Sequence, residues 1–340
     1  MDFTPIISAV IAFAVCAASG KIIIPFLHKL KFGQTILDIG PKWHEKKQGT
    51  PTMGGIMMVL GFLSGVAVAI TFASIFSTGL SAELKSSKYV TRLIAGLALS
   101  VGMGLIGFFD DYIKVVKKRN LGLTARQKTF MQLLVSAAYL ATLYLAGSHS
   151  TWIPFVGEIS VTSGVGIIFW PIALMFIYGF TNAVNLTDGI DGLASSVTLI
   201  VACGFMLASG FLSNFLHNTL SAALAGACMG FLMWNAHPAK VFMGDTGSMF
   251  LGGAVVALSF GIGKPILLLL AGFVYLAEAL SVMIQVTVFK LTGKRVFKMS
   301  PIHHHFEMSG WNENKIVNVF SLVTLICCAL AVLLSIIDII

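Results

Sequence analysis

Apolar runs of about 20 residues recur along the whole chain and restrict it to one class of fold. A helix of that length crosses the hydrocarbon core of a bilayer with its backbone hydrogen bonds satisfied inside the segment. The composition agrees, since 57% of the residues are hydrophobic and only 11% are charged, against roughly 25% charged residues in soluble domains. A water-soluble fold would lack polar surface, so the sequence predicts an all-α, polytopic membrane protein.

Ten runs are long enough to span a membrane, and no internal repeat or second domain interrupts them, so we expect one domain over residues 1–340. After the eighth run, Gly263, Lys264 and Pro265 favour a two-helix hairpin or a kinked pair. Residues 148–163 alternate apolar and polar side chains around Val156 and Gly157, which is typical of a small hairpin. The predicted spans are residues 3–27, 53–73, 91–109, 129–147, 164–183, 193–212, 218–236, 247–262, 265–289 and 317–338.

Basic residues are divided unevenly between the two sides of these spans. One set of loops holds 17 of the 22 Lys and Arg residues. These loops are residues 28–52, 110–128, 184–192, 237–246 and 290–316. Because cytoplasmic loops retain Lys and Arg, we predict that this side is cytoplasmic and that both termini face outward. The net charge of +8 then fits contact with anionic lipids of the bilayer or with an anionic substrate, and no nucleic-acid partner is expected.

Five carboxylates lie at the predicted cytoplasmic ends of the spans: Asp110, Asp111, Asp188, Asp191 and Asp245. An acid in or near hydrocarbon is costly, so five at one face predict a functional site. Asp188 and Asp191 are spaced i, i+3 and share a face if the helix continues, whereas the adjacent Asp110 and Asp111 diverge by about 100°. Taken singly, each could instead be a solvated helix end, a helix cap or a turn residue.

The chemistry that these acids favour is metal-assisted phosphoryl transfer at the inner membrane surface. Asp245 lies in GDTGS, whose glycines leave the carboxylate accessible, and Mg²⁺ usually combines one or two carboxylates with substrate phosphates. Lys47 and Lys128 flank the same loops and suit a phosphate site, while no GxxxxGK[ST] segment is present. Three consecutive histidines, residues 303–305, cannot all bind one metal from a regular element, so a phosphate-binding or acid–base role fits them better.

Six segments form a more specific pattern, in this order along the chain: KKQGTPTMGG, FFDDYIKV, GLTARQK, NAVNLTDGIDGLA, NAHPAKVFMGDTGS and SPIHHHFE. The pattern covers nearly the whole chain and resembles the phospho-N-acetylmuramoyl-pentapeptide branch of the polyprenyl-phosphate N-acetylhexosamine-1-phosphate transferases. The resemblance implies a Mg²⁺-dependent, multi-pass enzyme of the bacterial cytoplasmic membrane. Its reaction would move phospho-MurNAc-pentapeptide from UDP-MurNAc-pentapeptide to undecaprenyl phosphate, giving lipid I and UMP in peptidoglycan biosynthesis.

The resemblance also implies roles for individual residues. Asp245 matches the Mg²⁺-binding aspartate, and Asp110 and Asp111 match the pair implicated in catalysis. Phe242 matches an aromatic residue that stacks on uracil. The catalytic candidates are Asp110, Asp111, Asp245, Lys128, His303, His304 and His305. The substrate-binding candidates are Lys47, Thr52, Asn182, Asn185, Asp188, Asp191, Asn235, Phe242 and Gln285.

Alternatives to this interpretation remain at three levels. The expected mechanism is direct attack of the lipid phosphate, and a two-step route through an aspartyl-phosphate competes with it. A UDP-GlcNAc transferase that makes another polyprenyl-linked sugar is the nearest other enzyme, although HHHFE argues against it. A cation-coupled transporter would place acids near the middle of its spans and repeat its halves, which this chain does not do. The oligomeric state is open, with a homodimer one assembly to consider.

Overall fold

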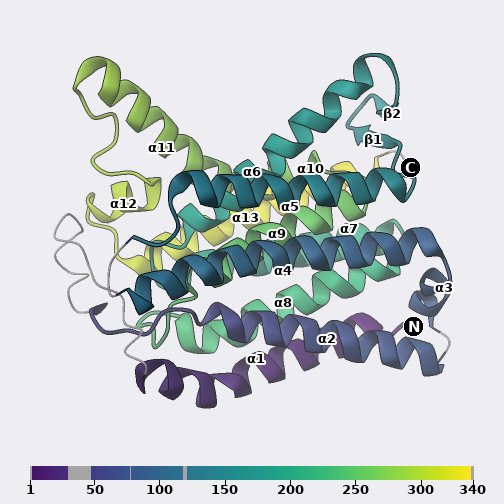
Figure 1. Ribbon diagram of the computed structural model, residues 1–340, viewed down its shortest axis with the longest axis horizontal. Coiled ribbons are helices and arrows are strands. Elements are labelled where there is room, and N and C mark those ends of the chain that lie inside the picture. Colours follow the sequence, from purple (N-terminus) through teal and green to yellow (C-terminus); the bar gives the residue numbers. More distant parts are fainter. Residues whose placement is uncertain (1, 30–46, 77, 118–120, 338–340) are drawn as a thin grey trace.

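The computed structural model describes residues 2–29, 47–76, 78–117 and 121–337, and nearly all of the long elements are helices that run lengthwise beside one another (Figure 1). The elements are α1 (Thr4–Lys29), α2 (Gly55–Phe76), α3 (Gly79–Leu84), α4 (Ser87–Val116), α5 (Ala125–Leu145), β1 (Ser150–Ile153), β2 (Gly157–Ser160), the 3₁₀ helix η2 (Gly164–Ile168), α6 (Phe169–Thr187), α7 (Leu193–Phe211), α8 (Phe215–Asn235), α9 (Gly244–Gly261), α10 (Leu267–Ala271), α11 (Phe273–Thr292), α12 (Ile302–Glu307) and α13 (Glu313–Ile336).

Eight helices in the described part of the chain are long and apolar enough to cross a membrane. They are α1, α2, α4, α6 with the end of η2, α7, α8, α11 and α13. The prediction of an all-α, polytopic membrane protein is therefore confirmed. Two further predicted spans, residues 129–147 and 247–262, are helical as α5 and α9 but do not belong to these eight, so the predicted number of ten spans is not confirmed.

Helix α9 lies at the centre of the bundle and is more completely buried than the helices around it. Every residue from Thr246 to Gly261 is buried, so α9 is surrounded by protein and does not need the apolar surface of a lipid-facing helix. Its glycines let the neighbours approach: a Cβ at Gly252 would lie 2.7 Å from the Cα of Thr181 on α6, and one at Gly253 3.0 Å from the Leu99 carbonyl on α4. This packing fixes the position of the Asp245 end of α9.

The predicted span at residues 265–289 is interrupted at Gly272, which separates α10 from α11. A Cβ at Gly272 would lie 2.7 Å from the Leu268 carbonyl and 2.8 Å from the Phe180 ring, so this close approach requires glycine. Beyond the break, α11 leans away from the bundle toward α12 (Figure 1). The break expected at Gly263 to Pro265 is present between the end of α9 at Gly261 and the start of α10 at Leu267, and Gly272 adds a second break that was not predicted.

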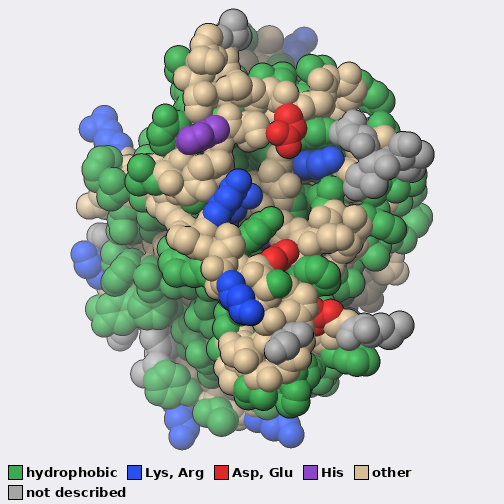
Figure 2. Space-filling view, turned by 90° about the vertical axis from the view of Figure 1, so that its right-hand side faces the viewer, with side chains coloured by type: hydrophobic (Ala, Val, Ile, Leu, Met, Phe, Trp, Pro, Cys, Tyr) green, Lys and Arg blue, Asp and Glu red, His purple; other side chains and the backbone are tan. Residues whose placement is uncertain are grey.

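Both ends of the chain lie at the same end of the bundle, away from α12 (Figure 1). The short hairpin of β1 and β2 lies at this end too, with Ser150 opposite Ser160 and Ile153 opposite Gly157, as the alternation around Val156 predicts. Figure 2 looks onto this end, where the charged side chains that are described lie scattered among hydrophobic ones. The charged side chains of the candidate active site lie elsewhere in the bundle.

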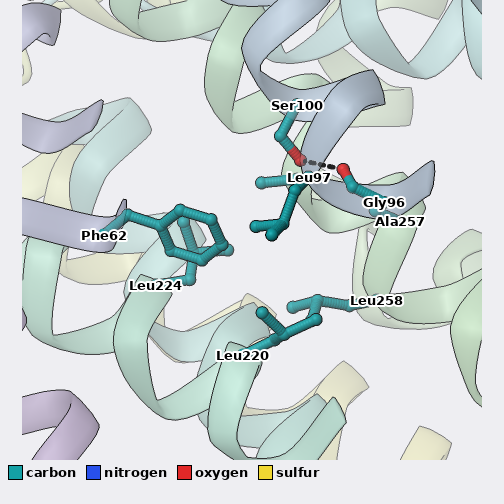
Figure 3. Close-up of a pocket in the computed structure, with 9 residues that line it drawn as sticks. Phe62, Gly96, Leu97, Ser100, Leu220, Leu224, Ala257 and Leu258 are labelled. Atoms are coloured by element: carbon teal, nitrogen blue, oxygen red, sulfur yellow. Dashed lines mark hydrogen bonds between the residues drawn. The ribbon is translucent and has the colours of Figure 1, made fainter. Parts of the chain in front are cut away.

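A small pocket inside the bundle, between α2, α4, α8 and α9, is almost wholly apolar (Figure 3). Its single hydroxyl, on Ser100, donates to the Gly96 carbonyl at 2.8 Å and so is satisfied within α4. Because no ionisable group lines it, we interpret this pocket as a packing gap without chemistry. Its lining residues are Phe62, Gly96, Leu97, Ser100, Leu220, Leu224, Ala254, Ala257 and Leu258.

Candidate active site

Three of the five predicted acids meet where the C-terminal part of α4 reaches the first turn of α9. Each of Asp110, Asp111 and Asp245 offers a carboxylate oxygen, and these three oxygens lie within 4.8 Å of one another. The Asp245 side chain is 20% exposed, whereas those of Asp110 and Asp111 are 6% and 4% exposed. Asp245 is therefore the member of this acidic triad that a ligand reaches most easily.

Asp111 caps the N-terminus of α9. Its carboxylate accepts hydrogen bonds from the Thr246 backbone N–H at 2.9 Å, the Thr246 hydroxyl at 2.7 Å and the Asp245 backbone N–H at 3.2 Å. These donors belong to the first turn of a helix, where N–H groups lack helical partners and the dipole favours an anion. Asp111 therefore ties the backbone of Asp245 to α4.

Asp110 ties the same end of α4 to the segment before α5. Its carboxylate accepts a hydrogen bond from the Leu123 backbone N–H at 2.9 Å and pairs with Lys114, one turn further along α4, at 2.6 Å. Gly122 passes so close that a Cβ there would lie 2.6 Å from an Asp110 oxygen. Thr124 then begins α5 with a capping box, and the first turn of α5 places Lys128 at the triad.

The Asp245 carboxylate is enclosed by cations on one side and an amide on the other. Lys114 and Lys128 contact the same oxygen, Oδ2, at 3.1 Å and 2.9 Å, and the Asn185 side-chain amide donates to Oδ1 at 2.9 Å. Burial alone raises the pKa of Asp245, but Lys128 and then Lys114 outweigh it, so the pKa lies below its ordinary value. Asp245 is therefore ionised at neutral pH.

Asp188, at the end of α6, has a different environment. Among the described residues, no cation or hydrogen-bond donor contacts its partly buried carboxylate. Burial, followed by the nearby carboxylates of Asp245, Asp111 and Asp191, raises its pKa well above the ordinary value. Asp188 is thus an acid beside the triad whose carboxylate has no partner among the described residues.

A second charged cluster forms around Asp191. Lys47 pairs with Asp191 and Glu313, each at 2.7 Å, and His237 Nδ1 lies 3.0 Å from the second Asp191 oxygen. The Ala239 backbone N–H donates to that same oxygen at 3.0 Å. The sequence predicted Lys47 and Asp191 as site residues but missed Glu313 and His237. The only local signals for these two were an acid in the first turn of the last helix and a histidine inside the NAHPAK segment.

The segment after Lys47 is joined to the segment before α9. The Phe242 backbone N–H donates to the Pro51 carbonyl, and the Gly54 N–H donates to the Phe242 carbonyl, both at 2.8 Å. Thr52 and Phe242, both half-buried, therefore lie beside the start of α9. Two substrate-binding candidates from distant motifs are thus placed together next to the triad.

Asn235 and Asn182, the two remaining asparagine candidates, form hydrogen bonds that hold the backbone and α6 in place. Asn235 accepts from the Gly192 N–H at 3.1 Å and donates to the Val241 carbonyl at 2.9 Å, which links the loop of Asp191 to the segment before α9. Asn182 exchanges hydrogen bonds with Gln132 on α5, at 3.2 Å and 3.3 Å. Both hold elements of the site in place.

The three histidines of α12 lie in three different environments. His303 is fully buried and its Nδ1 is 3.0 Å from Glu278 Oε2 on α11, while His304 Nδ1 lies 2.6 Å from Glu307. His305 is partly exposed and its Nδ1 accepts from the Lys298 backbone N–H at 3.2 Å. The sequence missed Glu278 because it lies in the middle of an apolar run and far from the motif.

Gln285, the last substrate-binding candidate, is engaged with the backbone. Its Oε1 accepts from the Val296 and Phe297 N–H groups at 3.0 Å and 2.9 Å, and its Nε2 donates to the Phe297 carbonyl at 3.2 Å. It therefore holds the chain between α11 and α12. Its contact with a substrate stays a prediction.

Comparison with known proteins identifies the family. Residues 93–262, which contain the triad, match the model of glycosyl transferase family 4. The phospho-N-acetylmuramoyl-pentapeptide-transferase of Acetivibrio thermocellus is 47% identical over 324 residues, covering 94% of this chain and 92% of that protein. Proteins of the same name from Clostridium perfringens and Caldicellulosiruptor bescii are 45% and 43% identical over 327 and 331 residues, covering 96% and 97% of this chain and 95% and 97% of theirs. The chain therefore belongs to glycosyl transferase family 4 and, within it, to the phospho-N-acetylmuramoyl-pentapeptide-transferases.

Proposed function

We propose that this protein transfers phospho-MurNAc-pentapeptide from UDP-MurNAc-pentapeptide to undecaprenyl phosphate, giving lipid I and UMP. The observation that carries the proposal is the acidic triad, in which the most accessible carboxylate, Asp245, faces two lysines at one end of an apolar bundle. The name shared by the relatives favours the muramoyl donor over UDP-GlcNAc and a transferase over a cation-coupled transporter. UMP release from purified protein supplied with both substrates tests the proposal directly.

We infer that Mg²⁺ is the cofactor and that Asp245 is its main protein ligand. The donor set fits: three carboxylates converge, and hard divalent cations select oxygen ligands. Mg²⁺ usually takes only one or two carboxylates and completes its shell with phosphate oxygens and water, which suits one accessible aspartate. When bound, the ion would neutralise charge on the donor diphosphate and on the departing UMP.

The residues of the chain would bind, orient and balance charge. In the proposed reaction a lipid-phosphate oxygen bonds to the β-phosphorus of the donor, and the bond from that phosphorus to the bridging oxygen of UMP breaks. Lys114 and Lys128 offset the negative charge of the reacting phosphates. A lipid phosphate is already largely ionised near neutral pH, so Asp110, which holds Lys114 and the Leu123 backbone, serves to orient groups more than to remove a proton.

Direct attack predicts that UMP is released only when the lipid acceptor is present. Both oxygens of Asp111 and both of Asp110 are engaged in hydrogen bonds or ion pairs, which disfavours either as a covalent nucleophile. Enzyme that is free of lipid phosphate should therefore neither release one equivalent of UMP from the donor nor exchange labelled UMP into it. A stoichiometric burst of UMP under these conditions would support the two-step route instead.

We also propose that the triad faces the cytoplasm and that both termini face outward in a bacterial cytoplasmic membrane. The excess of basic residues on the triad side supports this orientation. After replacement of the native cysteines, a cysteine at Asn312 should react with an impermeant thiol reagent only in opened membranes, and one at Ser86 should react in intact spheroplasts. Labelling of position 312 from outside would reverse the topology. Lys118, an alternative probe, lies outside the described residues, and a homodimer stays a prediction.

A further inference from the structure

A buried carboxylate and imidazole connect α11 to α12. Glu278 and His303 are both 0% exposed, and their Oε2 and Nδ1 atoms are 3.0 Å apart. The backbone N–H of His303 also points to Oε2, at 3.4 Å. One carboxylate oxygen therefore fixes both the backbone and the ring of this histidine, which sets the orientation of the imidazole.

Each member of the pair keeps one polar atom without a partner. Within the described residues, Glu278 Oε1 and His303 Nε2 are buried and make no hydrogen bond. Such orphan atoms are rare in folded proteins because they lose water without gaining a replacement. A leucine at position 278 would avoid this penalty, so stability alone does not account for the pair.

The far side of the His303 ring packs against the loop between the two substrate-binding acids. A Cβ at Gly189 would collide with His303 Nε2, so the ring occupies the space that a side chain would need. Gly189 itself is exposed and stands between Asp188 and Asp191. The His303 imidazole therefore supports this loop by direct packing.

We propose that Glu278 is a positioning residue that acts through His303: it presses the imidazole against Gly189, and so keeps Asp188 and Asp191 in place for the UDP-sugar donor. This inference deepens the proposed function and rests on the donor-binding role of that loop. Among the described residues, Glu278 makes no hydrogen bond or ion pair with the acidic triad. Its loss should therefore weaken donor binding more than it slows the chemical step.

The first test separates acceptor chemistry from shape at position 278. Glu278→Leu, which cannot accept from Nδ1, should raise the donor KM about tenfold, while kcat and the lipid KM change less than about twofold. Glu278→Gln keeps a carbonyl acceptor and should stay within about threefold of the unmodified enzyme. Ser281→Ala, one turn along, is the matched control and should have no effect, because the Ser281 hydroxyl donates, among the described residues, to the Glu278 carbonyl of its own helix. If Glu278→Leu does not fold, Glu278→Asp, whose carboxylate is one methylene shorter, replaces it.

The second test asks whether the effect passes through the ring. In a His303→Ala background, Glu278→Leu should cause no further loss of kcat/KM, because the group through which it acts is absent. Gly189→Ala should raise the donor KM in the native background and lose most of that effect beside His303→Ala. Gly179→Ala, on α6 with no atom within 4 Å of the added Cβ, is the control.

Two results would overturn the proposal: unchanged donor KM in Glu278→Leu, or losses at 278 and 303 that simply add. Asp191→Asn reports separately on the loop. If it leaves the donor KM unchanged, the donor-binding role fails, whereas the coupling between positions 278 and 303 is still decided by the double-mutant comparison.

Discussion

Asp245→Asn should lower kcat by about 10³-fold and leave the fold intact, because it removes the accessible anion that Lys114, Lys128 and the proposed Mg²⁺ share. The amide keeps the shape of the side chain and can still accept from Asn185. The deficit should persist at saturating Mg²⁺ and donor, since it concerns the transition state. UMP release at a series of Mg²⁺ concentrations measures it.

Glu158→Gln is the matched control for this variant. Glu158 lies on β2 at the opposite end of the molecule, and the Ser150 hydroxyl donates to it at 3.1 Å. The same loss of one negative charge there should leave kcat within about twofold of the unmodified value, since surface substitutions away from special features have small effects. Turnover of Asp245→Asn within tenfold of the unmodified enzyme would refute the assignment of the metal and catalytic centre.

Lys47→Met should both destabilise the protein and impair donor use. Lys47 is the only lysine or arginine, in the described part of the chain, that pairs with Asp191 or Glu313, whose side chains are 2% and 9% exposed. Removal of one partner from a buried ion pair typically costs 3–5 kcal/mol, because the remaining charge stays buried. We therefore expect the free energy of unfolding to fall by about 3 kcal/mol, with kcat/KM for the donor reduced about 100-fold.

A second substitution separates these two effects. Adding Glu313→Gln to Lys47→Met removes one of the stranded negative charges and should restore about half of the lost stability without restoring donor use. Lys315→Met, an exposed neighbour on α13 whose ammonium lies over the Trp311 ring, is the control and should change both quantities little. Equilibrium unfolding in mixed micelles and initial-rate kinetics give the two measurements. Unaltered stability of Lys47→Met would contradict the account of this cluster.

That the three aspartates of the triad lie at one end of the bundle could be predicted from the sequence. The side chains that contact them could not be predicted as fully. Apolar runs of helical length put residues 110, 111 and 245 at the same end of their helices, and membrane geometry then brings these ends to one plane. Local patterns do not specify which side chains touch. Lys47 and Glu313, which form an ion pair, are separated by 266 positions in the sequence. Glu278 is an acid in an apolar helix, and its partner lies on α12, which the sequence around position 278 does not indicate.

The interruption of the predicted span at residues 265–289 illustrates the same limit. A proline and a glycine at 263–265 gave a local reason for the break between α9 and α10, which is present, whereas no such signal marks the further break at Gly272, where the Phe180 ring and the Leu268 carbonyl lie close. Half of that crowding comes from another helix, so no window of the sequence contains it. The predicted number of ten spans stays a prediction, because α5 and α9 are helices but are not among the eight described helices that are long and apolar enough to cross a membrane.

The two lysines that contact Asp245 stabilise the triad when no substrate is bound. Three carboxylates that converge with no cation would repel one another and force the ends of α4 and α9 apart. Lys114 and Lys128 are permanent counter-ions for these carboxylates, because they belong to the same chain. The proposed Mg²⁺ would therefore not be needed to hold the ends of α4 and α9 together between reactions.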